Sequence, residues 1–150
     1  VDKLTAVVDK LISNGYRTFL VGLAWGFDLK VFEVLLTKKN YNIDIIACVP
    51  CKEQSTYFKK EEKQKYEDFL KQADKVVYVS NEYFDGCMQK RNRYMVDRSD
   101  MVLAIWNGEH SGGTWDTIKY AQKCEKPIQY NMLKKMGLFE RLRSAECLSK

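Results

Sequence analysis

Residues 18–28 read TFLVGLAWGFD, a short apolar run followed by two glycines and an aspartate. The apolar run Thr18–Val21 is typical of a buried strand, and Gly22 marks its end. From Asp28 onward the spacing of apolar residues predicts a helix, whose inner face carries Leu29, Phe32, Leu35 and Leu36. A strand that leads through a glycine turn into a helix predicts an α/β fold.

The same succession repeats along the rest of the chain. Apolar runs predict strands near 18–22, 43–49, 75–80, 101–106 and 127–131. Amphipathic stretches predict a first helix that ends at Asn14-Gly15 and further helices over about 58–72, 86–98 and 112–123. A short closing helix is predicted near 138–148. Strands this apolar are buried on both faces by crossover helices, so we expect one domain over residues 1–150 with a doubly wound, mostly parallel sheet.

The composition favours an intracellular protein. Of the 150 residues, 45% are hydrophobic and 30% charged, and the net charge of +5 favours a phosphate-bearing partner without requiring one. The five cysteines are irregularly spaced, which indicates reduced thiols and a cytoplasmic location. No apolar run reaches the roughly 20 residues that span a bilayer, so no membrane partner is expected. Because the chain starts inside an amphipathic pattern and without Met, we expect its natural N-terminus to lie further upstream.

Two glycine turns follow strands and open helices, which is where a doubly wound sheet binds its ligand. In the first turn, Gly22 and Gly26 allow the backbone to approach a ligand, and Asp28 is placed to cap the helix or to bind a ribose hydroxyl. The second turn, residues 111–114, reads SGGT and offers consecutive N–H groups to a phosphate. Each turn also fits a plain tight turn with a helix cap, and the first lacks the third glycine of the dinucleotide fingerprint.

Other chemistry-bearing residues have less support. Arg91 and Asn92 lie in a predicted helix, where they either reach a phosphate and a base or ribose, or belong to an exposed basic face. Cys48 and Cys51 have C-x-x-C spacing but no further ligands, and the single histidine, His110, has no obvious partner, so we expect no metal and no cofactor. Three tryptophans fall near the expected crevice and serve either base stacking or core packing: Trp25, Trp106 and Trp115.

Four segments together resemble a known family: residues 22–28 (GLAWGFD), Glu53-Gln54, residues 89–97 (QKRNRYMVD) and residues 112–121 (GGTWDTIKYA). They resemble the YpsA-like family of the SLOG superfamily, a Rossmann-like group that also includes the DNA-processing protein DprA and the cytokinin-activating LOG proteins. The resemblance runs from about residue 15 to 128. It implies a Rossmann-like fold and a nucleotide or nucleotide-derived ligand. The candidate ligand-binding residues are Gly22, Ala24, Trp25, Gly26, Asp28, Glu53, Arg91, Asn92, Gly112, Gly113 and Thr114.

The sequence departs from the family pattern at three points. The family usually opens with a strand and a Thr-Gly-His-Arg-like turn, and this N-terminal strand is missing before Val1, so its part of the pocket is absent or replaced. The glycine pair of the family's first turn reads Gly22-Leu23 here. The LOG enzymes carry a catalytic Glu after their glycine-threonine turn, whereas the nearby carboxylate here is Asp116, so LOG-type glycosidic hydrolysis is not supported.

The sequence is therefore compatible with three functions. The first is a domain that binds or senses a nucleotide-derived small molecule without chemistry of its own, which the missing catalytic relay favours. The second is a hydrolase of a nucleoside phosphate or an ADP-ribose-like substrate, with Asp28, Glu33 or Asp116 as general acid or base. The third, suggested by the resemblance to DprA, is single-stranded nucleic-acid binding through Arg91, Arg93 and nearby lysines, which the modest net charge and the dispersed lysines disfavour. Assembly into a homo-oligomer is left open.

Overall fold

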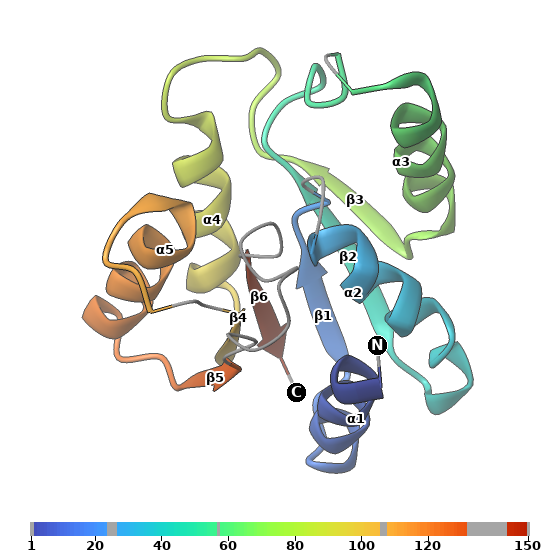
Figure 1. Cartoon of the computed structure of the whole chain (residues 1–150), viewed down its shortest axis with the longest axis vertical. Coiled ribbons are helices and arrows are strands. Elements are labelled where there is room, and N and C mark those ends of the chain that lie inside the picture. Colours follow the sequence, from blue (N-terminus) through green and yellow to red (C-terminus); the bar gives the residue numbers. More distant parts are fainter. Residues whose placement is uncertain (1, 24–26, 57, 106–107, 132–143, 150) are drawn as a thin grey trace.

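The computed structural model describes residues 2–23, 27–56, 58–105, 108–131 and 144–149 (Figure 1). Helices and strands alternate through most of the chain. The strands are β1 (Thr18–Val21), β2 (Asp44–Val49), β3 (Lys75–Tyr78), β4 (Met101–Ile105), β5 (Ile128–Asn131) and β6 (Ser144–Ser149). The helices are α1 (Asp2–Ser13), α2 (Phe27–Leu36), α3 (Lys60–Gln72), α4 (Cys87–Asp97) and α5 (Gly112–Lys123), with a short 3₁₀ turn at Lys39–Tyr41. All five strands predicted from the sequence are present.

The six strands form one sheet in the order β3-β2-β1-β6-β4-β5. The pairs β1–β2, β2–β3 and β4–β5 are parallel, whereas β6 is antiparallel to both β1 and β4. Since β1 and β4 both oppose β6, they point the same way, and β1 to β5 end at one edge of the sheet. The chain moves outward from β1 to β3 and then crosses back to β4, so its direction of winding reverses between β1 and β4.

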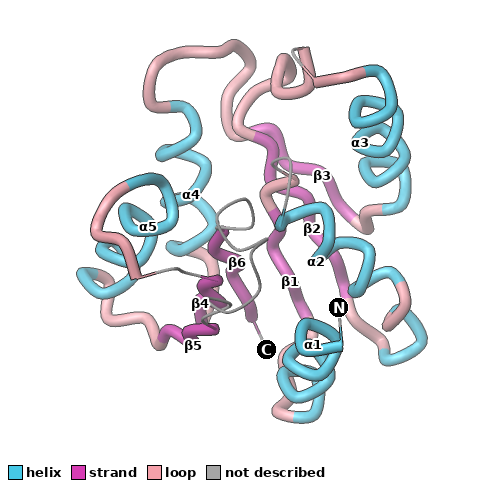
Figure 2. Tube along the Cα trace, in the orientation of Figure 1, coloured by secondary structure: helices cyan, strands magenta, loops and turns pink. Residues whose placement is uncertain are grey.

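Helices lie on both sides of this sheet (Figure 2). Two clusters of buried side chains form a separate core on each face. On β1, Phe19 and Val21 pack in the larger core with α1, α2 and α3, whereas Leu20 packs in the smaller core with Met95 of α4 and Ala121 of α5. Alternate side chains of a strand point to opposite faces, so these memberships place α1 to α3 on one face and α4 and α5 on the other. This confirms the doubly wound α/β fold.

The closing helix predicted near 138–148 is wrong over 144–148, because the chain forms β6 (Ser144–Ser149) there; residues 138–143 lie outside the described residues. The segment SAECLS has no β-branched residue, so its local sequence does not favour a strand. Tertiary context decides instead. Without β6, the facing edges of β1 and β4 would leave their backbone N–H and C=O groups unpaired inside the sheet, and β6 pairs with both.

None of the helices in the described ranges is long and apolar enough to span a membrane.

Candidate functional site

Arg91 lies at the ends of β1 and β2 and is buried, with 3% of its surface exposed. Its Nη1 donates hydrogen bonds to the carbonyl oxygens of Gly22 (2.6 Å) and Cys48 (3.1 Å), and its Nε donates to Oδ1 of Asn92 (2.8 Å). α4 holds Arg91 in this place because Met95, one turn further on, is anchored in the core on the same helix face. A single guanidinium therefore joins the first two strand ends at the edge where a ligand is expected.

Gly22 is required where it stands because no side chain fits there. A Cβ built on Gly22 would lie 2.5 Å from Nη1 and 2.7 Å from Cζ of Arg91, and 3.0 Å from Oδ2 of Asp28. Asp28 is itself buried and lies in the first turn of α2, one residue after the helix begins, where a carboxylate interacts favourably with the helix dipole. Gly22, Asp28, Arg91 and Asn92, all predicted as site residues, thus form one polar cluster.

Gln54 completes this cluster from the loop after β2. Its Nε2 donates to the carbonyl oxygen of Gly22 (3.3 Å), while its Oε1 is buried. Among the described residues, two buried side-chain polar atoms lack a hydrogen-bond partner: Gln54 Oε1 and Ser80 Oγ. Ser80 follows β3, and its backbone N–H donates to the carbonyl oxygen of Pro50 (3.1 Å). Both atoms therefore lie in loops at the carboxyl edge of the sheet.

The second glycine turn lies at the same edge, after β4. Ser111 precedes α5 and makes no side-chain capping hydrogen bond, so it does not satisfy the N–H groups of the first helical turn. Gly113 is exposed, and nothing lies within 4 Å of a Cβ built on it. Gly112 has a φ of +87°, a conformation that favours glycine. Thr114 is buried beneath the turn.

The predicted site residues thus divide into three groups. The contacts above join Gly22, Asp28, Arg91 and Asn92 directly. The turn Gly112–Thr114 shares the edge of the sheet with them, on the other side of the point where the winding reverses. Glu53 is exposed in the loop after β2, and Ala24, Trp25 and Gly26 lie outside the described residues. That these residues contact a ligand stays a prediction.

Sequence reasoning missed Gln54 as a site residue, although it noted the pair Glu53-Gln54. A glutamine just after a strand that ends in a proline is a weak signal, because most such side chains face solvent. The two other carboxylates considered for catalysis do not join Asp28 in the cluster. Glu33 forms an ion pair with Lys65 of α3, and Asp116 forms one with Lys119 of α5 at 3.5 Å.

The cysteines near the site are free thiols. Burial raises the pKa of Cys48 to about 11, and this effect exceeds the opposing influence of the Arg91 charge. Burial also raises the pKa of Cys51, whose thiol contacts that of Cys87 at the start of α4. No group of three or more potential metal ligands occurs within the described part of the chain. A thiol with a raised pKa is a poor nucleophile, and Cys48 packs in the smaller core.

A doubly wound sheet with glycine turns on both sides of its reversal point defines the chain as a Rossmann-like α/β protein. The model of the family named YpsA, described as "YspA SLOG family", matches residues 2–136. The chain therefore belongs to the YpsA family of SLOG proteins, as its motifs indicate.

Three relatives show how far the similarity extends. The Bacillus subtilis "Uncharacterized SPbeta prophage-derived protein YoqJ" is 35% identical over 138 aligned residues, which cover 81% of this chain and 80% of that protein. A UPF0398 protein of Halalkalibacterium halodurans is 27% identical over 126 residues, covering 81% and 67%. The "UPF0398 protein YpsA" of Bacillus subtilis is 26% identical over 141 residues, covering 86% and 78%. None of these names states a ligand or a reaction.

Proposed function

We propose that the carboxyl edge of the sheet binds a nucleotide or nucleotide-derived small molecule, and that the protein acts by binding or sensing it. The observation that carries this proposal is the buried polar cluster around Gly22. Arg91 and Asp28 are both only 3% exposed, and burying charged side chains costs several kcal/mol unless other interactions offset it. Such groups concentrate at functional sites more often than elsewhere in a fold.

The unpaired atoms at this edge indicate what the ligand offers. A buried acceptor without a partner costs about 1–3 kcal/mol, and a hydrogen-bond donor from a ligand recovers that cost at Gln54 Oε1. A ribose hydroxyl or an exocyclic base amine supplies such a donor. The first turn of α5, with its exposed Gly113, supplies N–H groups that favour a phosphate. Sugar or base contacts near Gly22 and phosphate contacts near Gly113 together match a nucleotide.

The separation of the acidic side chains favours binding over hydrolysis. A hydrolase of this type needs a general acid or base close to the reacting atoms. Glu33 and Asp116 each form an ion pair with a lysine and do not join the polar cluster around Gly22. Of the three candidate carboxylates, Asp28 alone belongs to that cluster, so it lacks a second carboxylate from this set as a catalytic partner.

The substitution Gly113→Val tests the proposed site. Since nothing lies within 4 Å of a Cβ built at this exposed position, the protein leaves room for a side chain, and a loss of binding in a variant that keeps its melting temperature reflects the ligand. Native mass spectrometry first identifies molecules that copurify with the protein, and calorimetry then measures the affinity of AMP, ATP, NAD and ADP-ribose. We expect Gly113→Val to lower the affinity for whichever compound binds by tenfold or more, which corresponds to about 1.4 kcal/mol of binding free energy.

The matched control is Gln122→Val, which adds the same side chain at an exposed position near the other end of α5. It should leave the affinity unchanged, while the loss of the hydrogen bond from Gln122 Nε2 to the Tyr130 hydroxyl and the lower helix propensity of valine lower the stability slightly. The proposal fails if none of the four compounds binds and nothing copurifies, or if Gly113→Val and Gln122→Val bind equally well.

A further inference from the structure

Two hollows adjoin each other along the outer side of α4 and α5. The first, with a volume of about 340 Å³, lies between the two helices and is lined by Asn92 and Thr117 among others. The second, of about 490 Å³, extends toward Gly86 at the start of α4. Gln89, Arg93 and Tyr120 line both, so the hollows form one continuous groove. Among the described residues, those of the two glycine turns do not line this groove.

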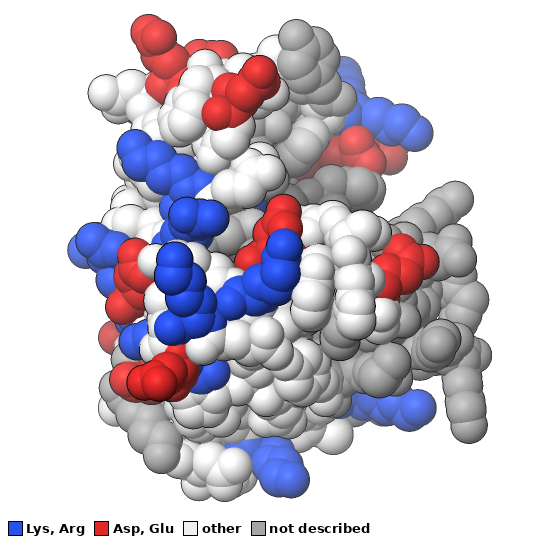
Figure 3. Space-filling model, turned by 90° about the vertical axis from the view of Figure 1, so that its left-hand side faces the viewer, with Lys and Arg blue, Asp and Glu red and all other residues white. Residues whose placement is uncertain are grey.

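The groove is strongly basic. Its lining includes five cations and two carboxylates: Lys90, Arg93, Arg98, Lys119 and Lys123, with Asp97 and Asp116. Both carboxylates are engaged, because Asp97 accepts a hydrogen bond from the Tyr120 hydroxyl (2.6 Å) and Asp116 pairs with Lys119. By contrast, α3 carries four cations and four carboxylates, which balance each other. Figure 3, which faces the side of the molecule formed by α4 and α5, shows Lys and Arg gathered over its left and central part, with a few Asp and Glu among them.

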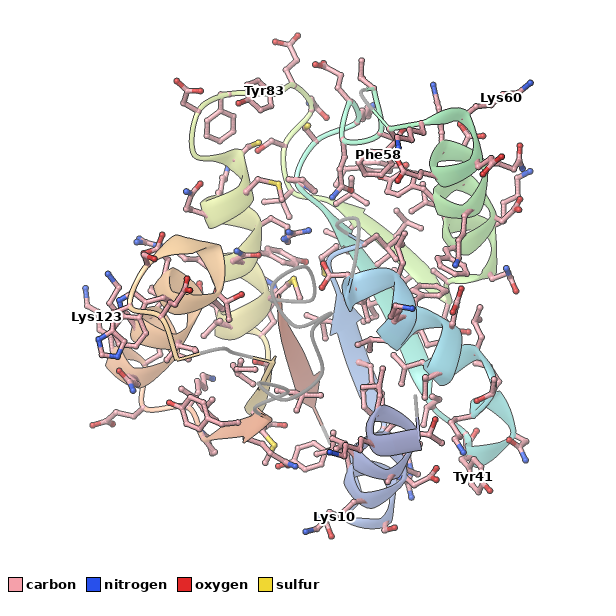
Figure 4. The ribbon with its side chains drawn as sticks, viewed as in Figure 1. Lys10, Tyr41, Phe58, Lys60, Tyr83 and Lys123 are labelled. Atoms are coloured by element: carbon pink, nitrogen blue, oxygen red, sulfur yellow. The ribbon has the colours of Figure 1, made fainter. Side chains whose placement is uncertain are left out.

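Aromatic rings accompany these cations. The Arg93 guanidinium lies 4.9 Å from the centre of the Tyr120 ring, and that of Arg98 lies 3.7 Å from the centre of the Tyr94 ring. At the Gly86 end of the groove, Lys90 Nζ lies 5.7 Å from the centre of the Phe84 ring. Phe84 is 42% exposed and Tyr83 is 63% exposed (Figure 4 labels Tyr83 on the loop before α4). Phe84 thus offers a stacking surface next to a cation, while the neighbouring Tyr83 donates a hydrogen bond to Asp85 Oδ1 (3.5 Å) and leaves its ring exposed.

We propose that this groove, called here the α4–α5 groove and defined by the five cations above, binds single-stranded nucleic acid together with the exposed rings of Phe84 and Tyr83 on the loop before α4. The cations contact successive phosphates, and the two exposed rings stack on unpaired bases. An acidic peptide would use the cations but leaves the exposed rings unexplained, and a duplex keeps its base faces stacked inside. Arg91 takes no part, because its guanidinium is buried against the strand ends.

The proposal is tested by fluorescence anisotropy with a labelled oligothymidylate of about 15 nucleotides, a length suited to one site of this kind. Titrations are made between about 50 and 200 mM salt, because each phosphate contact in a single strand adds about 0.7 to the slope of log affinity against log salt. The double variant Arg93→Ala/Lys123→Ala should therefore lower the slope by about 1.4. The matched control, Lys60→Ala/Lys63→Ala on α3, removes the same charge away from the groove and should not change it (Figure 4).

A second substitution tests the stacking. Phe84→Ala should weaken binding by about fivefold or more, as expected for the loss of one stacked base, and Phe84→Trp should retain it. Gly113→Val should leave oligonucleotide binding unchanged, which separates this groove from the nucleotide site proposed above.

Three results would overturn the proposal: no binding at about 50 mM salt, equal or tighter binding of a duplex of the same length, or displacement of the oligonucleotide by polyglutamate at equal charge concentration. The last result would identify the groove as a surface for acidic proteins.

Discussion

Arg91→Ala should destabilise the protein strongly, although the substitution lies on a helix and removes a charged side chain. The guanidinium makes two hydrogen bonds to carbonyl oxygens, of Gly22 at 2.6 Å and of Cys48 at 3.1 Å, and one to Asn92. Alanine reaches none of these groups, and the side chain it replaces is only 3% exposed. The carbonyl oxygens at the ends of β1 and β2 would therefore lose a charged donor in a buried place.

The size of the effect follows from these contacts. A hydrogen bond to a charged group contributes about 1.5–3 kcal/mol, so the two carbonyl bonds together contribute about 3–6 kcal/mol. Releasing the guanidinium from its buried site returns part of this, because the charge is better solvated in the unfolded chain. We expect the free energy of unfolding to fall by about 3–5 kcal/mol. For a chain of this size the melting temperature should fall by about 6–20 °C.

Urea denaturation followed by circular dichroism measures this change, and Arg93→Ala provides the matched control. Arg93 lies two residues further along α4 but is exposed, and its contact with the Tyr120 ring should contribute only about 0.5–1 kcal/mol. If Arg91→Ala costs no more than Arg93→Ala, the guanidinium does not hold the strand ends together and the reasoning is refuted.

Three further predictions concern single groups. Gly22→Ala should cost about 1–3 kcal/mol of stability, because its Cβ would lie 2.5 Å from Arg91 Nη1, and a double-mutant cycle should show this cost reduced by more than half in the Arg91→Ala background. Cys48, whose buried thiol has a pKa of about 11, should stay unmodified by a disulfide reagent at about pH 8 while the partly exposed Cys124 reacts; peptide mapping showing equal labelling would contradict this. The hydrogen bond to Asp97 raises the pKa of Tyr120 to about 12. The stability that this hydrogen bond contributes is therefore present below about pH 10 and is lost as the pH rises through 12. In Asp97→Asn, the ultraviolet titration of tyrosinate should shift to lower pH, and an unchanged curve would count against the contact.

The sequence predicts the parallel part of the sheet well because burial on both faces leaves a clear pattern. The run IIACV in β2 and the run MVLAI of β4 are apolar throughout, and each lies between two helices that carry apolar residues at helical spacing. β6 could not be predicted in the same way. Its place between β1 and β4 is fixed by the unpaired edges of strands that lie far earlier in the chain, and no local pattern in Ser144–Ser149 indicates such an edge.

The sequence predicted which loops form the candidate site, but it did not predict which side chains contact one another there. Glycines after strands indicate a close backbone approach, and the structure places both turns at the expected edge. What the backbone at Gly22 approaches is a protein side chain, Arg91, which is distant in sequence. An arginine that binds a phosphate and one that binds carbonyl groups have the same signature in a sequence, because both are polar residues on an otherwise apolar helix face. Burial alone distinguishes them.

Helix α4 shows why sequence spacing misjudged the distribution of charge. Consecutive residues on a helix point to different sides, so Arg91 faces the strand ends while Lys90 and Arg93, its neighbours, line the outer groove. Along the chain these cations look dispersed, and Lys119 and Lys123 are a further 26 residues or more away. Packing of α4 beside α5 on one face of the sheet brings these four exposed cations, together with Arg98, to one groove. A nucleic-acid strand responds to charge density in space and not to charge density in sequence, so the dispersal of lysines along the chain is no argument against such a partner.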